Sequence, residues 1–120
     1  MTDLINSPPH YTAHASGIEA IEICSRLDFV TGNAVKYLFR AGHKSSHLQD
    51  LQKAAWYLRR AKTLGTSPPQ VTLAYAVAQA EPEGSVLRDV LQYLVLTDTP
   101  RLDLALARVE REIEFVQEGL

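Results

Sequence analysis

The sequence has very little cysteine, tryptophan and methionine, with one residue of each among its 120. A single cysteine excludes an intramolecular disulfide, and the position of Cys24 in the run "IEAIEICSRL" predicts a small buried thiol rather than a nucleophile. No apolar run reaches the roughly 18 residues that identify a membrane-spanning helix. The opening "MTDLINSPPHY" also lacks the charged and apolar regions of a secretory signal. We therefore expect a cytoplasmic protein with no membrane partner.

Strong net charge is also lacking. The chain carries a formal charge of −2, so it has no overall basic field that would gather nucleic acid, and we expect nucleic acid not to be its partner. Its composition, 46% hydrophobic and 22% charged, is that of an ordinary globular protein.

Strand patterns are scarce, whereas helical periodicity recurs along the chain. We predict an all-α protein, a compact bundle of about five to six short helices after an extended Pro-rich N-terminal arm. The linker "GTSPP" separates a helical region over 1–64 from a second over 66–120, which either belongs to the same domain or serves oligomerisation. The predicted helix starts are Thr31 as a cap, Ser46 with Gln49 as a capping box, Ser67 with Pro68, and Thr99 with Pro100.

The last predicted helix has an apolar seam with alternating steps of four and three residues, as in a coiled coil. This pattern favours either packing on the protein's own domain, the preferred interpretation for so short a repeat, or a homo-oligomer formed through the C-terminal helices. The seam consists of Leu102, Leu106, Val109, Ile113, Val116 and Leu120.

Cations are concentrated in one part of this acidic chain. Between Asn33 and Lys62 there are seven cations and one acid, Asp50, so this stretch carries +6 and the remainder carries −8. Such segregation suits a compact anion such as a nucleotide phosphate, although a solvated helix face explains many charge runs. The solvated explanation fits Arg59, Arg60 and Lys62 well, since cations at the end of a helix complement its dipole.

The stretch "GNAVKYLFRAGHK" has the strongest functional pattern. Asn33, Lys36, Tyr37 and Arg40 share one side of a predicted helix, with Lys44 in the turn that follows. Arginine offers phosphate a planar fork, and lysine offers a mobile charge. Neither a Walker-type phosphate loop nor a dinucleotide fingerprint occurs, so a nucleotide site here has to be built from side chains.

Two further groups of residues are candidates. The carboxylates of Glu19, Glu22 and Asp50 are of the type that holds Mg²⁺, the one cofactor we consider, although Asp50 lacks a paired acid. The four histidines lack the compact spacing of a zinc site. His10 follows two prolines and precedes Tyr11, which predicts a tip that stacks on a base or contacts phosphate.

An ordered set of short motifs over roughly residues 6 to 62 resembles the phage-associated SaV-like family, domain of unknown function 3310. The motifs include Pro9-His10-Tyr11, Gly17-Ile18-Glu19, Gly32-Asn33, Lys36-Tyr37, Arg40, Gly42, Lys44, Asp50-Leu51, Lys53-Ala54 and Tyr57-Leu58. Ser7, between Asn6 and Pro8, departs from the family's Asn-Pro-Pro-His-Tyr start and puts the role of Asn6 in doubt. One member of the family looks like a phage nucleotide kinase without a Walker loop.

The resemblance implies a phage-type protein of the bacterial host cytoplasm that binds deoxynucleotides and transfers a phosphoryl group between them. The implied catalytic residues are His10, Glu19 and Arg40. The implied nucleotide-binding residues are His10, Tyr11, Asn33, Lys36, Tyr37, Arg40, Lys44 and Lys53. Two alternatives stay open: a noncatalytic protein that sequesters nucleotides or nucleotide signals, and a helical module for self-association or interaction.

Overall fold

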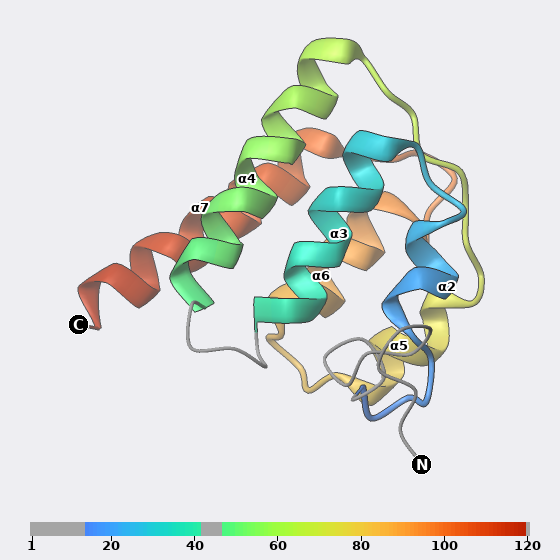
Figure 1. Cartoon of the computed structure of the whole chain (residues 1–120), viewed down its shortest axis with the longest axis horizontal. Coiled ribbons are helices and arrows are strands. Elements are labelled where there is room, and N and C mark those ends of the chain that lie inside the picture. The colour runs from blue at the N-terminus through green and yellow to red at the C-terminus, as the bar shows by residue number, and fades with distance from the viewer. Residues whose placement is uncertain (1–13, 42–46, 120) are drawn as a thin grey trace.

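The computed structural model describes residues 14–41 and 47–119, and in these ranges it contains six α-helices and no strand (Figure 1). The all-α prediction is therefore confirmed, while the Pro-rich arm lies outside the described residues. The helices are α2 (Ala20–Cys24), α3 (Phe29–Ala41), α4 (His47–Leu64), α5 (Ala74–Ala80), α6 (Val86–Leu94) and α7 (Leu102–Glu118).

One apolar core joins the two halves of the chain. α3 and α4 lie side by side, α7 packs along α4 and α6, and α2 packs on α3 (Figure 1). The fully buried core side chains come from both halves of the chain, for example Val35 and Leu58 from the first and Leu91 and Val109 from the second. Burial of such apolar surface is the main stabilising term of the fold.

The start of α3 differs from the prediction. The helix begins at Phe29, and the carboxylate of Asp28 accepts a hydrogen bond from the Thr31 backbone N–H at 2.9 Å, so Asp28 rather than Thr31 is the capping residue. Thr31 lies in the first turn and is fully buried. Gly32 is also buried, and a Cβ atom there would lie 3.0 Å from the carbonyl oxygen of Cys24. Glycine thus permits the close approach of α2 to α3.

Two predicted helix starts in the second half are wrong. The chain after Ser67 is not helical, because the Val71 N–H donates to the Val95 carbonyl at 2.9 Å and α5 begins only at Ala74. A proline that precedes another proline is disfavoured in helical conformation, which keeps Pro68 out of a helix. α7 begins at Leu102 after Arg101 instead of at a Thr99 cap. α4 ends at Leu64, and the following Gly65 has a φ of +70°, the left-handed conformation that commonly ends a helix.

The apolar seam of α7 faces the protein's own core. Leu106 and Val109 are buried, and Leu102, Ile113 and Val116 pack against the core cluster. The seam therefore packs on the protein's own domain, which was the preferred of the two interpretations. Leu120, its last residue, lies outside the described residues. None of the helices in 14–41 and 47–119 is both long and apolar enough to cross a bilayer.

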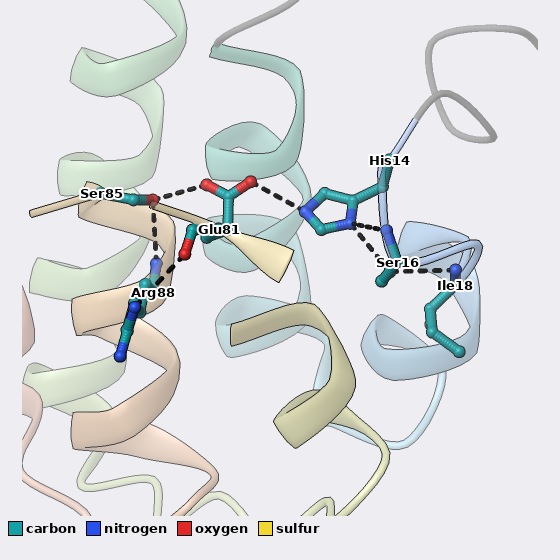
Figure 2. Close-up of polar contacts among 6 residues, drawn as sticks. All are labelled: His14, Ser16, Ile18, Glu81, Ser85 and Arg88. Carbon is teal, nitrogen blue, oxygen red and sulfur yellow. Dashed lines mark hydrogen bonds and ion pairs between the residues drawn. The ribbon is translucent and has the colours of Figure 1, made fainter. Parts of the chain in front are cut away.

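Two polar clusters tie distant segments together. The first joins His14, before α2, to Glu81, after α5, and continues to Ser85 and Arg88 at the start of α6 (Figure 2). The second is centred on Arg108, which is 7% exposed and donates to Asp89 at 2.7 Å, to Glu112 at 2.9 Å and to the Gly84 carbonyl at 2.8 Å. These clusters hold the α5–α6 region against α2 and α7.

Candidate anion-binding site between α3 and α4

The side chains predicted to bind a nucleotide on the helix after Gly32 do lie along α3. Asn33, Lys36, Tyr37 and Arg40 are partly exposed, while Ala34, Val35 and Leu38 on the other side of the helix are buried. The helical spacing of three and four residues accounts for this division. The sequence pattern therefore placed these four side chains correctly on one accessible side of the helix.

Three cations gather around one aromatic ring. The Lys36 Nζ lies 4.7 Å from the centre of the Tyr37 ring, and the Arg40 Cζ lies 5.6 Å from it. Lys53 reaches the same ring from α4, with its Nζ at 5.3 Å. Contacts of this length are within the range of cation–π attraction, which helps to hold like charges together. We call Lys36, Arg40 and Lys53 around Tyr37 the cation cluster.

The cation cluster has no internal counter-charge. None of the ion pairs within the described part of the chain includes Lys36, Arg40 or Lys53. The Arg40 Nε is buried and has no hydrogen-bond partner there, and neither has the Oδ2 of the 1% exposed Asp50. A buried donor without an acceptor costs about 1–3 kcal/mol. Arg40 as a whole is only partly buried, so an anion would approach its guanidinium from the exposed part rather than at the buried Nε.

An aromatic chain extends from the cation cluster across α4. The Tyr37 ring stacks on Tyr57, with centroids 5.9 Å apart and an interplanar angle of 16°. Tyr57 in turn contacts Trp56 edge to face at 5.0 Å. The sequence prediction did not include Trp56 in the site, although an adjacent Trp-Tyr pair three and four residues after a lysine on a helix was the available signal.

A hollow of about 410 Å³ opens between α2 and α3 beside the cation cluster. Asp28, Asn33 and Lys36 line it together with apolar side chains that include Ile21 and Phe29, which are 58% and 77% exposed. The Asp28 carboxylate there accepts from the Thr31 N–H. The Asn33 side-chain nitrogen donates to the Phe29 carbonyl at 2.8 Å, and its amide oxygen has no hydrogen bond within the described residues. An apolar hollow with a polar acceptor next to cations is suited to a flat ring that bears an anionic group.

The carboxylates predicted to hold Mg²⁺ do not form that site. Among the residues the structure describes, no group of three or more His, Cys, Asp or Glu side chains could hold a metal ion. Glu19 and Glu22 instead form the capping box of α2, in which Glu22 accepts from the Glu19 N–H at 2.7 Å. Asp50 lies on α4, whereas α2 packs on α3. No step of the chemistry is therefore assigned to magnesium.

Cys24 borders the α2–α3 hollow, and burial raises the pKa of its thiol to about 12. A thiol with so high a pKa is protonated at neutral pH and is a poor nucleophile, in line with the sequence interpretation. His10, Tyr11 and Lys44, which complete the predicted site, lie outside the described residues, so they remain predictions.

The fold and the site define an all-α protein with a cationic and aromatic surface between two adjacent helices. The family model of DUF3310, a protein family of unknown function, matches residues 5–59. This match supports the family resemblance over the segment that contains α2, α3 and most of α4. The family description names no activity. No curated protein and no solved structure matches the chain significantly.

Proposed function

We propose that this protein binds deoxynucleotides, with the nucleotide phosphate at the cation cluster and the base in the α2–α3 hollow. The observation that supports the proposal best is the gathering of Lys36, Arg40 and Lys53 around Tyr37 with no acidic partner in the described residues. Arg40 supplies a partly exposed guanidinium, and Lys36 and Lys53 add positive charge from α3 and α4.

The more specific proposal is a nucleotide kinase that transfers a phosphoryl group between deoxynucleotides. In that reaction a phosphate oxygen of the acceptor forms a bond to the terminal phosphorus of the donor, and the bond to the donor's bridging oxygen breaks. Catalysis of this kind depends mainly on positioning and on stabilisation of negative charge. Lys36, Arg40 and Lys53 would stabilise that charge, and His10 or Glu19 would orient the acceptor.

The nucleotide site is tested by calorimetric titration of the purified protein with dTMP and dTTP. We expect Arg40→Ala to weaken binding by roughly tenfold or more, because a charged hydrogen bond contributes about 1.5–3 kcal/mol. Arg111→Ala is the matched control, since it removes the same charge from the exposed side of α7. Equal affinity of Arg40→Ala and wild type would show that the cation cluster is not the binding site.

Phosphoryl transfer is tested separately, by incubation with mixed deoxynucleoside mono- and triphosphates and separation of the products. New diphosphates support the kinase. Nucleotides that bind but stay unchanged support the noncatalytic alternative, a protein that sequesters nucleotides at the same site.

The homo-oligomer predicted through the C-terminal helices would need a face of α7 other than its apolar seam, which is already packed on the core. Phe115, which is 72% exposed on α7, is the largest apolar side chain available there. Analytical sedimentation of the wild type and of Phe115→Asp measures the oligomeric state, and the variant should have the lower mass if Phe115 lies in the interface. A wild-type monomer would remove the self-association alternative.

A further inference from the structure

The Trp56 side chain is an exposed aromatic surface next to the proposed phosphate site. It is 56% exposed, and it contacts Tyr57, which stacks on Tyr37 of the cation cluster. Because Tyr37 and Tyr57 cover a face of each other, Trp56 offers the most accessible ring of the three for a further stacking partner. It is also the only tryptophan of the chain.

Two further cations, Arg59 and Arg60, lie beside Trp56. A hollow of about 270 Å³ is lined by Trp56, Arg59, Arg60 and Thr63, which lie on the outer side of α4. Arg59 pairs with Glu110 of α7 at 3.5 Å, but both side chains are half exposed, and such a pair contributes at most about 1 kcal/mol. Arg60 has no acidic partner within the described residues.

Apolar or aromatic surfaces and cationic groups thus alternate across three helices. The α2–α3 hollow comes first, then the cation cluster, then Trp56, then Arg59 and Arg60. A mononucleotide, with one base and its phosphate group, uses only the first two. We infer that the surface from the α2–α3 hollow to Trp56 binds a short single-stranded nucleic acid: the first base in the hollow, a phosphate at the cation cluster, and the next base on Trp56.

The inference rests on the proposed function in one respect, since both place a phosphate at the cation cluster. Proteins bind single-stranded nucleic acid through two such features, aromatic side chains that stack on bases and cations that follow the backbone. The chain's net charge of −2 does not prevent this, because the positive charge is concentrated on α3 and α4. An acidic protein segment would use the cations as well, but a nucleic acid carries a flat base beside every phosphate and so supplies a ring to stack on Trp56 in any sequence.

The experiment uses the full chain, with the fluorescence of Trp56 as its signal. The ligands are dTMP and an oligothymidylate of about eight nucleotides, within the usual size of single-strand sites. We expect the oligonucleotide to quench Trp56 and to bind at least about tenfold more tightly than dTMP, because stacking on one additional ring strengthens binding by that order. Its affinity should also fall with salt, and Arg60→Ala should reduce the slope of log affinity against log salt by about 0.7.

Variants are measured by anisotropy of a 5′-labelled oligonucleotide, because Trp56→Ala has no tryptophan signal. Trp56→Ala should lower the affinity for the oligonucleotide roughly fivefold to a hundredfold, and Trp56→Phe should lower it much less. The affinity for dTMP should be unchanged in both variants. Tyr75→Ala is the matched control, since Tyr75 is 61% exposed on α5 and lines neither the α2–α3 hollow nor the hollow beside Trp56, so its loss should change neither affinity.

The outcomes separate the two proposals. If dTMP binds at Arg40 but the oligonucleotide binds no more tightly and ignores Trp56→Ala, the present inference is overturned and the proposed nucleotide site stands. If Arg40→Ala leaves dTMP binding intact while Arg40→Ala and Trp56→Ala both weaken oligonucleotide binding, the mononucleotide site fails and the present inference stands. If a polyglutamate peptide quenches Trp56 as strongly as the oligonucleotide, the surface is a protein contact and the inference is overturned.

Discussion

The His14 imidazole and the Glu81 carboxylate are joined by a hydrogen bond of 2.9 Å, although 67 residues separate them (Figure 2). The other ring nitrogen, Nδ1, lies 3.0 Å from the Ser16 backbone nitrogen and 2.8 Å from the Ser16 hydroxyl oxygen. Because an ionised carboxylate can only accept, Nε2 carries a proton and donates it to Glu81. The His14 ring is buried and also packs edge to face on Phe39 of α3. His14 therefore connects the start of the described chain to the end of α5 through this bond and to α3 through the ring contact.

We predict that Glu81→Ala lowers the free energy of unfolding by about 1–3 kcal/mol, because it leaves the buried His14 donor without an acceptor. It also removes the acceptor of the Ser85 hydroxyl, which caps α6. Urea unfolding followed by circular dichroism measures the change. Glu83→Ala, at an exposed position two residues away, is the control and should alter stability by less than about 0.5 kcal/mol. Equal stability of the two variants would contradict a structural role for the His14–Glu81 bond.

Arg108→Met should lower the free energy of unfolding by more than Glu81→Ala does. Burial by itself lowers the pKa of Arg108, but hydrogen bonds to Asp89 and Glu112 more than compensate and raise it, so the guanidinium stays charged. Its removal leaves both acids beside an apolar side chain, which should cost about 2–3 kcal/mol, somewhat less than for a fully buried pair because the acids are partly exposed. Arg111→Met, on the exposed side of the same helix, is the matched control.

A double-variant cycle tests whether the loss of stability in Arg108→Met comes from the acids that it leaves unpaired. Asp89→Asn combined with Arg108→Met should cost less than the sum of the two single losses, since the second change removes the charge that the first had left unpaired. Strict additivity would mean that Arg108 acts by packing alone.

The sequence was sufficient to predict the helical class and the accessible side of α3, because both follow from a periodicity of 3.6 residues. It was less reliable at helix starts, where several residues of capping type lie close together. Thr31 and Asp28 are both residues of capping type, and in the structure Asp28 accepts from the Thr31 N–H while the helix begins at Phe29. At Pro68, the following proline was a signal against a helix that the prediction overlooked.

Contacts between distant residues were beyond the sequence prediction. Nothing local to Lys53 or Tyr57 indicates that α4 places them against Tyr37 of α3. The pairing of His14 with Glu81 is likewise a result of tertiary packing. The charge balance indicated a cationic region of the chain, and the packing of α3 on α4 determined which of its cations meet.

Cys24 predicts a specific dependence of stability on pH. Its pKa is raised from 9.0 to about 12 in the folded protein, so between these values the unfolded thiol ionises while the folded one stays protonated. The folded state then binds more protons, and stability is lost as pH rises through this window. We expect the difference in unfolding free energy between wild type and Cys24→Ala to shrink by up to about 1.4 kcal/mol per pH unit above pH 9. A difference that stays constant from pH 8 to pH 10.5 would contradict the buried thiol.

Gly32→Ala tests the contact that shapes the α2–α3 hollow. In an exposed helix this change stabilises by about 0.5–1 kcal/mol, because alanine is the better helix former. At Gly32, however, the new Cβ would lie 3.0 Å from the Cys24 carbonyl oxygen, which belongs to the backbone and cannot rotate away. Overpacking of this kind costs about 1–3 kcal/mol, so we expect a net loss of about 1 kcal/mol in thermal or urea unfolding.

The matched control for that change is Gly119→Ala at the end of α7, where φ is −73° and the nearest atom to a new Cβ, the Phe115 carbonyl oxygen, lies at 3.4 Å. Here alanine should be neutral or slightly stabilising, since neither the backbone conformation nor the packing opposes it. Because Gly32 lines the hollow and Gly119 does not, Gly32→Ala should also weaken dTMP binding while Gly119→Ala leaves it unchanged. A gain in stability at both positions would show that α2 does not press on α3 at Gly32, and the hollow would then lack the rigid wall that the proposed base site requires.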